Sequence, residues 1–361
     1  MRAKRLVLFI ASLSGGGAER VLSQIANAWA DQGIEVHLVT WNGLRTPDFY
    51  KVSDAVHRHE LGQVNRPRST LQRIGHGVQL LLSMRRLIRE LAPDGVLSFI
   101  DVTNVLVLIA SLGLPARIVV AERVDPATNN TLSLWWRLMR PMAYRQASLV
   151  VAQTREIAVW MESHWRASIT VIPNFLRSMP PPAVNREMLV ISVGRLVPQK
   201  AFENSIKAFA RLSERHPEWR YVILGDGPMK MELLSLCDQL GISEKVSLPG
   251  LIEDVEAWLS RAAICVQPSR FEGFPNAVME AMAMGVATIS TDCRSGPKDL
   301  ITPFENGLLV PVGDLSALEI AMERLIIDEP LRTTIGRSAV KVRERFSRDS
   351  VMRQWTTALL D

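Results

Sequence analysis

The chain has 361 residues, of which 47% are hydrophobic and 22% are charged, a globular composition that excludes intrinsic disorder. This length suits two domains of ordinary size better than a single core. The three cysteines, Cys237, Cys265 and Cys293, form no paired motif. Their spacing excludes a disulfide framework and a zinc site, and it indicates small core residues in a reducing compartment.

The charge is distributed unevenly along the chain. Residues 1–177 carry 21 Lys and Arg against 13 Asp and Glu, a net charge of +8, whereas residues 178–361 carry 21 against 24, a net charge of −3. A basic first half favours an anionic partner, such as a phosphate-bearing acceptor or a membrane surface. The alternative is a surface bias that serves only solubility. No nucleic-acid recognition module occurs, so no nucleic-acid partner is expected.

The first apolar run, LVLFIASL, follows a basic start, as in a secretory signal. It is short and continues directly into SGGGAER, which favours a buried first strand. The stretch from Val102 to Val120 comes nearest to a membrane span, but Asn104, Gly113 and Pro115 interrupt it. We therefore expect no spanning helix and a cytoplasmic protein.

Short apolar runs alternate with helical patterns through the first half. The predicted strands are 5–11, 35–40, 95–100, 117–122, 148–153 and 169–174. Helices are predicted at 18–32 and 70–91, between the strands at 95–100 and 117–122, and in a Trp-rich segment that follows the strand at 117–122. Buried parallel strands are continuous apolar runs joined by helical crossovers, so this pattern predicts a parallel α/β domain.

The stretch SMPPPAVNRE, residues 178–187, is the predicted linker because consecutive prolines fit neither a helix interior nor a central strand. The strand and helix pattern then starts again. We expect an N-terminal domain at 1–177, a second domain at 188–342 and a C-terminal helix at 343–361 that returns to the first domain. Two such doubly wound domains are expected to face each other across a ligand-binding cleft.

Three motifs carry chemistry. Ser14–Gly17 (SGGG) opens a helix directly after the first strand, where backbone N–H groups suit a phosphate, although a simple tight turn explains it equally well. It is not the dinucleotide fingerprint, because Arg20 replaces the third glycine. Gly194–Lys200 (GRLVPQK) places Arg195 and Lys200 between a strand and a helix, where they suit a diphosphate, or Lys200 is a solvated helix cap.

The third motif spaces two carboxylates eight residues apart, at Glu272 and Glu280, around a strand–loop–helix junction. Carboxylates accept hydrogen bonds from vicinal diols, which suits one to sugar hydroxyls and the other to a ribose. Glu280 stands among apolar residues, where an unpaired carboxylate is costly. A ligand diol or a basic neighbour is therefore expected to satisfy it.

The GRLVPQK segment, followed by PSRFEGFPNAVMEAMAMGVATIST with its E-x7-E spacing, resembles glycosyltransferase family 4. The resemblance extends over nearly the whole chain, through SGGGAER, VIPN, GDGP and NGLLVP. It implies the two-domain GT-B fold, a retaining mechanism and a UDP-sugar donor. The sequence contains no D-x-D, which is consistent with a metal-independent enzyme without a cofactor.

Carried over residue by residue, the resemblance implies that Arg195 and Lys200 bind the donor diphosphate. It assigns Glu272 to the donor sugar and Glu280 to the ribose. The other implied donor-binding residues are Gly16, Gly17, Leu251, Gly273, Phe274, Asn276 and Ala277.

The chain departs from the family at Glu122 and Arg123, where many members have a histidine near the donor sugar. This departure resembles a bacterial subgroup that extends polyprenyl-diphosphate-linked oligosaccharides, often with N-acetylhexosamines, in surface-glycan or glycoprotein-glycan assembly. We count Glu122 among the catalytic candidates; the alternative is that it forms a structural ion pair with Arg123.

Basic residues interleaved with leucine and tryptophan suit an anionic bilayer and a diphosphate head group at the inner membrane face. The alternative is ordinary helix amphipathicity. The candidates for contact with the acceptor or membrane are Arg66, Arg68, Arg73, Arg123, Trp135, Trp136, Arg137 and Arg140.

The leading hypothesis is a GalNAc or related transferase acting on a lipid-linked glycan. A family-4 hexosyl or mannosyl transferase with another donor or acceptor is the first alternative. A nucleotide-sugar epimerase on the same fold would lack the combined GRLxxxK and E-x7-E motifs. A non-catalytic sugar-nucleotide-binding or interaction protein would have lost Arg195, Lys200 or Glu280, and all three are present.

Overall fold

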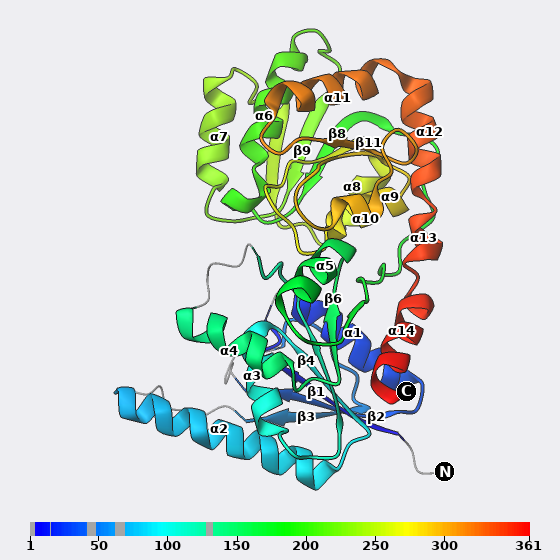
Figure 1. Ribbon diagram of the computed structural model, residues 1–361. Helices are drawn as coiled ribbons and strands as arrows, with labels where there is room; N and C mark the ends of the chain where they lie inside the picture. The colour runs from blue at the N-terminus through cyan, green and yellow to red at the C-terminus, as the bar shows by residue number, and fades with distance from the viewer. Residues whose placement is uncertain (1–3, 15, 42–47, 62–68, 128–132) are drawn as a thin grey trace. The chain divides into compact units, whose positions relative to one another are not determined.

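The computed structural model describes residues 4–14, 16–41, 48–61, 69–127 and 133–361 (Figure 1). The chain forms two compact units. Unit 1 consists of Met1–Asn174 and Val351–Asp361, and unit 2 of Phe175–Ser350. Each unit has its own parallel sheet, so the α/β class follows the sequence pattern.

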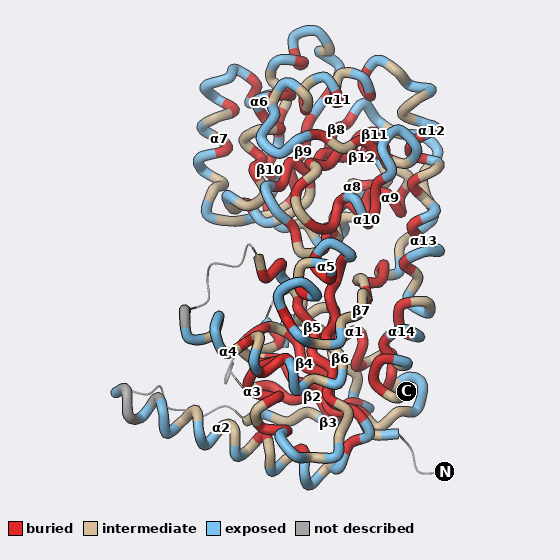
Figure 2. Tube along the Cα trace, viewed as in Figure 1, coloured by how far each residue is buried: buried red, intermediate tan, exposed pale blue. Residues whose placement is uncertain are grey.

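The sheet of unit 1 has, among the described residues, seven strands in the order β3-β2-β1-β4-β5-β6-β7. They are β1 Arg5–Ile10, β2 Glu35–Thr40, β3 Val56–Glu60, β4 Gly95–Phe99, β5 Arg117–Ala121, β6 Leu149–Ala152 and β7 Ile169–Val171. The five residues from Leu6 to Ile10 have no exposed surface, because helices cover both faces of the sheet. Figure 2 shows this burial along the strands.

The helices of unit 1 divide between the two faces of the sheet. Residues of α2 Thr70–Leu91, α3 Asp101–Ala110, α4 Leu134–Tyr144 and α5 Arg155–His164 share one apolar core with Val7 and Phe9. On the opposite face lie α1 Gly17–Asp31 and α14 Arg348–Leu360. Trp29 of α1 donates its Nε1 hydrogen to Thr356 Oγ1 at 3.0 Å. The C-terminal helix therefore belongs to the core of unit 1 from Val351 onward.

Edge strand β3 was not predicted from the sequence. Its segment, VHRHE, contains one buried apolar residue, Val56, and four polar ones. It pairs in parallel with β2 only, and an edge strand in this position needs little apolar side chain. The hydrophobic pattern therefore carried no signal for it.

Unit 2 contains a six-stranded parallel sheet with the order β10-β9-β8-β11-β12-β13 in its described residues. The strands are β8 Glu187–Val193, β9 Arg220–Leu224, β10 Val246–Gly250, β11 Ala262–Gln267, β12 Ala287–Thr291 and β13 Leu308–Val310. The helices are α6 Phe202–Ser213, α7 Lys230–Gln239, α8 Val255–Arg261, α9 Asn276–Ala283, α10 Pro297–Leu300, α11 Leu315–Ile327, α12 Glu329–Ala339 and α13 Val342–Arg345, with a 3₁₀ turn, η1, at Pro198–Lys200.

The segment that joins the two units has no regular structure. Residues 172–186 contain neither helix nor strand, and the predicted linker at 178–187 lies within this stretch except for Glu187, which opens β8. Unit 1 ends at Asn174, and residues from Phe175 onward pack with unit 2. The peptide N–H of Leu176, for example, donates to the carbonyl of Phe346 at 2.8 Å.

The three cysteines are buried and unbridged, as expected from their spacing. Burial raises the pKa of Cys237 to about 11 and the pKa of Cys265 and Cys293 to about 12. These thiols are therefore protonated core groups at neutral pH. Within the described ranges, no helix has both the length and the apolar character needed to cross a bilayer.

Candidate active site

The GRLVPQK loop of unit 2 follows β8 at the carboxyl edge of the sheet, where parallel α/β domains bind ligands. Hydrogen bonds fasten it to the loop that follows β11. The peptide N–H of Arg270 donates to the Gln199 carbonyl at 2.8 Å, and Gln199 Nε2 donates to the Phe271 carbonyl at 2.8 Å. Two motifs that are far apart in sequence thus form one surface.

Lys200 and Glu272 meet on this surface. Lys200 Nζ lies 2.7 Å from Glu272 Oε1, and the two side chains are 16% and 9% exposed. A side chain at Gly194 would press against the Lys200 stem, since a Cβ there would lie 3.2 Å from Lys200 Cε. Arg195 is exposed and has no protein hydrogen bond or ion pair among the described residues. The loop therefore presents one paired and one unpaired cation.

Two glycines allow the loop after β9 to close on the GRLVPQK loop. Gly225 and Gly227 have φ values of 141° and 159°. A Cβ on Gly225 would lie 1.9 Å from the carbonyl oxygen of Gly194, and one on Gly227 would lie 2.4 Å from that of Leu196. Only glycine permits this approach of backbone to backbone. The sequence GDGP is therefore part of the support for the cationic loop.

The second glutamate, Glu280, lies in α9 and is 6% exposed. Its Oε2 lies 3.2 Å from Arg177 Nη2, and the other terminal nitrogen of Arg177 pairs with Glu256 of α8. The expectation that a basic neighbour satisfies Glu280 is confirmed. Sequence reasoning did not find Arg177 itself, because Arg177 and Glu280 are 103 residues apart in the chain.

The remaining donor-site candidates lie around these loops. Leu251, directly after β10, is 81% exposed. Phe274 is buried in an apolar cluster that includes Phe346, and Gly273 is half-buried. The N–H of Asn276 already donates to the Phe274 carbonyl at 3.0 Å, whereas that of Ala277 lies in the first turn of α9 and has no carbonyl of its own helix to bond.

The glycine-rich loop of unit 1 opens α1 as predicted. Gly16 is the N-cap and uses no side-chain cap, and Gly17 is the first, exposed residue of the helix. The N–H of Gly16 donates to the Ser14 carbonyl at 2.7 Å. Gly17 and the residues after it keep the free N–H groups of a first helical turn, which suit an anion. Gly15 lies outside the described residues.

Glu122 follows β5 and is only 2% exposed. Tyr144 donates its hydroxyl hydrogen to the Glu122 carboxylate, and Arg140 Nη1 lies 3.6 Å from Glu122 Oε1 and 3.7 Å from Asp101 Oδ2. Burial raises the pKa of Glu122 to about 7, although Arg140 and Tyr144 act in the opposite direction. The ion-pair partner of Glu122 is thus Arg140, and the alternative pairing with Arg123 is wrong.

The neighbouring Arg123 points into unit 1. Its Nη2 donates to Asn174 Oδ1, and its guanidinium lies 4.5 Å from the centroid of the Phe99 ring. Burial lowers the pKa of Arg123 to about 9. This placement does not put the guanidinium on a surface that faces a bilayer.

Arg140 does not contribute to the exposed basic face that we expected. Its side chain is 6% exposed and lies over the Trp165 ring, 5.0 Å from the centroid. The reason is helical phase: Arg140 belongs to the α4 face that packs over Asp101 and Glu122.

The outward stripe of α4 instead contains Trp135, Leu138 and Met142, which are 65%, 62% and 62% exposed. Exposed Arg137 and Arg145 lie on the same helix or at its end. Trp136 is half-buried. Among the remaining candidates, Arg66 and Arg68 lie outside the described residues, and for Arg73 the structure describes the backbone only.

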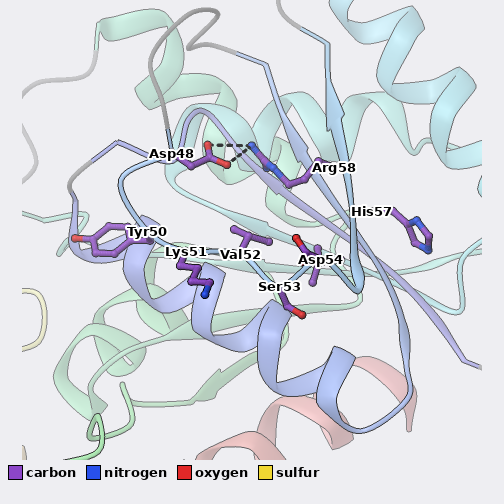
Figure 3. A pocket seen from close by; sticks show the side chains of 9 residues that line it. Asp48, Tyr50, Lys51, Val52, Ser53, Asp54, His57 and Arg58 are labelled. Atoms are coloured by element: carbon purple, nitrogen blue, oxygen red, sulfur yellow. Dashed lines mark hydrogen bonds and ion pairs between the residues drawn. The ribbon is translucent and has the colours of Figure 1, made fainter.

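A separate hollow of about 570 Å³ lies in unit 1 beside β3 (Figure 3). Asp48 and Arg58 point toward each other across it, with Oδ2 and Nη2 3.0 Å apart. Its other lining residues are Tyr50, Lys51, Val52, Ser53, Asp54, Val56 and His57. None of these belongs to the predicted site.

Near this hollow, Glu35, His37 and His57 form a group whose donor atoms lie within 4.8 Å of one another. The hydrogen-bonding needs of His37 are met without an ion, since Nδ1 lies 2.9 Å from His59 Nε2 and Nε2 lies 3.0 Å from Glu35 Oε1. Arg5 Nε also lies 2.7 Å from Glu35 Oε1. This guanidinium disfavours a metal cation, so the cluster is explained by its own contacts.

Both halves of the chain match known family models. Residues 15–177 match the model described as Glycosyltransferase Family 4, and residues 179–342 match the one described as Glycosyl transferases group 1. The two parallel α/β units, with these motif loops in unit 2, define a glycosyltransferase of the GT-B class. The chain belongs to the glycosyltransferases of family 4.

Relatives of similar length are known from Campylobacter jejuni. The alpha-1,4-N-acetyl-D-galactosaminyltransferase named for GalNAc-GalNAc-diNAcBac-PP-undecaprenol is 28% identical over 364 residues, and the match covers 97% of each chain. The 4-alpha-N-acetylgalactosaminyltransferase named for N-acetylgalactosamine-N,N'-diacetylbacillosaminyl-diphospho-undecaprenol is 27% identical and covers 99% of this chain and 100% of its own.

Two further similarities concern part of the chain and the fold. A match to an exopolysaccharide phosphotransferase of Streptomyces coelicolor is 34% identical over 211 residues, but it spans only 22% of that protein and 57% of this chain. The solved structure of Anabaena HepE in complex with UDP superposes with a TM-score of 0.80 at 19% identity and covers 99% of both chains. This similarity supports the fold.

Proposed function

We propose that this enzyme transfers an N-acetylhexosamine, GalNAc before others, from a UDP-sugar to a polyprenyl-diphosphate-linked oligosaccharide. The observation that carries the proposal is the contact of Lys200 with Glu272 at the carboxyl edge of unit 2, 2.7 Å between Nζ and Oε1. It places a cation for phosphate and an acceptor for sugar hydroxyls on one surface. The two Campylobacter relatives, both named as GalNAc transferases on undecaprenyl-linked glycans, support this choice of sugar and acceptor.

Two cations of unit 2 are suited to the donor diphosphate. Arg195 is exposed on the same loop as Lys200, so both can approach one group. The first turn of α1 in unit 1 and the N–H of Ala277 are further phosphate donors. Because these groups suffice to balance phosphate charge, we propose that transfer requires no metal ion and no other cofactor.

The proposed reaction retains the anomeric configuration. The bond between the anomeric carbon and the diphosphate oxygen breaks, and the acceptor hydroxyl attacks the same face of the sugar. The departing phosphate oxygen takes the proton of that hydroxyl, and Arg195 and Lys200 stabilise the remaining charge. This route requires no general base from the protein, which agrees with the enclosure of Glu122 by Tyr144 and Arg140.

For the acceptor, we propose that α4 meets an anionic membrane surface at the inner face of the cell membrane. The stripe of Trp135, Leu138 and Met142 recurs at helical spacing and is more than half exposed. Exposed apolar side chains in such an arrangement mark an interaction surface. With Arg137 and Arg145 beside them, they suit the interface of an anionic bilayer, where a lipid-linked acceptor resides.

A donor screen tests the proposal. The purified full chain is incubated with membrane lipid extract and, in separate reactions, UDP-GalNAc, UDP-GlcNAc, UDP-glucose, UDP-galactose or GDP-mannose. We expect the fastest release of nucleotide diphosphate and the fastest labelling of lipid with UDP-GalNAc. Turnover with GDP-mannose alone, or labelling of a water-soluble glycan alone, would contradict the proposed donor or acceptor.

A further inference from the structure

Glu280 is held in a setting where a free carboxylate is unfavourable. It is 6% exposed in α9, and its neighbours Met279, Ala281 and Met282 are at most 1% exposed. A carboxylate removed from water needs a charged or hydrogen-bonding partner. A rigid partner also decides in which direction the carboxylate oxygens point, and this direction matters for any ligand that the carboxylate binds.

Arg177 provides this partner with both ends of its guanidinium fork. Nη2 lies 3.2 Å from Glu280 Oε2, and Nη1 pairs with Glu256 Oε1. The Arg177 side chain is 26% exposed and that of Glu256 is 20% exposed, so both are largely shielded from water. A planar fork that is fixed at two points has few alternative orientations. Arg177 therefore constrains the rotamer of Glu280.

The same guanidinium fixes α9 to α8. Glu256 lies in the first turn of α8, whose N-cap Asp254 accepts a hydrogen bond from the N–H of Ala257 at 2.9 Å.

We propose that Arg177 is a positioning residue, which holds Glu280 in the orientation that accepts hydrogen bonds from the ribose hydroxyls of a nucleoside diphosphate. This inference rests on the proposed function, since it assigns the nucleotide of the donor to this site. Arg177 fixes Oε2 of Glu280, and the carboxylate presents its remaining lone pairs to the ribose diol. The site then selects ribose over deoxyribose, and the selection depends on Arg177.

The test compares two probes by isothermal titration calorimetry on the full chain: UDP, and 2′,3′-dideoxy-UDP, which lacks both ribose hydroxyls. We expect the wild-type protein to bind UDP at least about tenfold more tightly, as charge-assisted hydrogen bonds allow. In Arg177→Ala we expect UDP to weaken toward the dideoxy probe, until the two Kd values agree to about twofold. Arg177→Lys, which keeps the charge without the fork, should give an intermediate ratio.

The ratio separates positioning from general damage, because a merely structural loss weakens both probes equally. Arg261→Ala is the matched control: it removes an exposed arginine of α8 that pairs with Glu187 at 2.7 Å, and it should keep the wild-type ratio. A wild-type ratio in Arg177→Ala overturns the inference and leaves the proposed function intact. No preference in the wild-type protein overturns both the ribose role of Glu280 and the inference.

A second variant keeps the test available if Arg177→Ala does not fold. Glu256→Gln leaves Arg177 and Glu280 in place but removes the charge that fixes the other end of the fork. We expect the UDP preference of this variant to fall by about threefold or more. An unchanged preference in folded Glu256→Gln would overturn the positioning role.

Discussion

Lys200 Nζ lies 2.7 Å from Glu272 Oε1, and this ion pair joins the loop after β8 to the loop after β11. The two side chains are largely buried, so each neutralises the other in a setting where an isolated charge is costly. The pair also brings the residue expected at the diphosphate next to the residue expected at the donor sugar. Loss of either charge should therefore affect both the stability of unit 2 and its expected chemistry.

Replacement of Lys200 by Ala should reduce kcat on the order of a hundredfold or more, because a cation that stabilises a leaving group acts mainly in the transition state. The measurement is steady-state turnover with the donor found in the screen. The protein should remain folded, with a free energy of unfolding lower by about 1–3 kcal/mol because Glu272 loses its partner.

The stability part of this effect can be removed with Lys200→Ala/Glu272→Gln. In the double variant the neutral amide no longer requires a counter-charge, so the free energy of unfolding should recover toward the wild-type value. The turnover should stay low. Near-normal turnover in a folded Lys200→Ala protein would remove Lys200 from the diphosphate site.

Activity should survive exhaustive treatment with EDTA. Arg195, Lys200 and helix N-termini are proposed to balance the diphosphate charge, and Glu272 and Glu280 are already paired with Lys200 and Arg177. Initial rates with and without chelator should agree within about twofold. If activity disappears with EDTA and returns with magnesium or manganese, a metal ion carries the role proposed for the two cations.

The sequence predicted the units and the motif loops because both have local signals. Parallel strands such as 35–40 are continuous apolar runs, and the predicted helix at 70–91 has the same bounds in the structure. The segment GRLVPQK and the E-x7-E spacing identify loops at strand ends without any knowledge of tertiary contacts. Edge strand β3 has no such signal, since its segment VHRHE has only one buried apolar residue.

Tertiary partners of charged residues were the part that sequence could not supply. The need of Glu280 for a basic neighbour follows from its apolar surroundings, but nothing local indicates Arg177. Arg140 shows the opposite error. An arginine on an amphipathic helix was expected in water, and only the packing of α4 over Asp101 and Glu122 places it in the interior.

Substitution of Glu122 by Gln should change how stability depends on pH. The pKa of Glu122 is raised from 4.5 to about 7, so the folded protein holds a proton that the unfolded chain releases between these values. In the wild-type protein the favourable contribution of the protonated carboxyl is therefore full below pH 4.5 and is lost as the pH rises through 7. The variant, which cannot ionise, does not lose it.

The free energy of unfolding of Glu122→Gln, relative to wild type, should therefore rise between about pH 5 and pH 8, by up to about 3 kcal/mol. Urea titrations at a series of pH values measure this difference. A relative stability that is flat over this range would show that Glu122 is ionised throughout. We expect the turnover of Glu122→Gln to be reduced but not abolished.

Charge reversal at Arg137 and Arg145 should weaken binding to anionic vesicles. Both residues are exposed beside the apolar stripe of α4, and each basic residue near such a surface contributes about 1 kcal/mol. Co-sedimentation with phosphatidylserine vesicles should fall about tenfold or more in the double Glu variant. Raising the salt concentration should weaken wild-type binding, because exposed charges are screened over roughly 8 Å at physiological ionic strength.

Arg353→Glu provides the control, since Arg353 is exposed on α14, away from the stripe. This variant should bind vesicles as the wild type does. Wild-type protein that ignores anionic vesicles at low salt would remove the membrane role of α4.

The stereochemical prediction concerns the anomeric configuration of the product. An inverting enzyme needs a general base opposite the leaving group, within reach of the attacking hydroxyl. Glu122 is the residue that we considered for such a role, and its carboxylate is 2% exposed, bonded by Tyr144 and paired with Arg140. In contrast, the carboxyl edge of unit 2 offers cations that stabilise a departing diphosphate, whose own oxygen can take the proton on the same face. An α-linked UDP-sugar should therefore give an α-linked product, which the proton NMR coupling constant of the new anomeric centre measures. A β-linked product would contradict the same-face mechanism and would require a base that these residues do not provide.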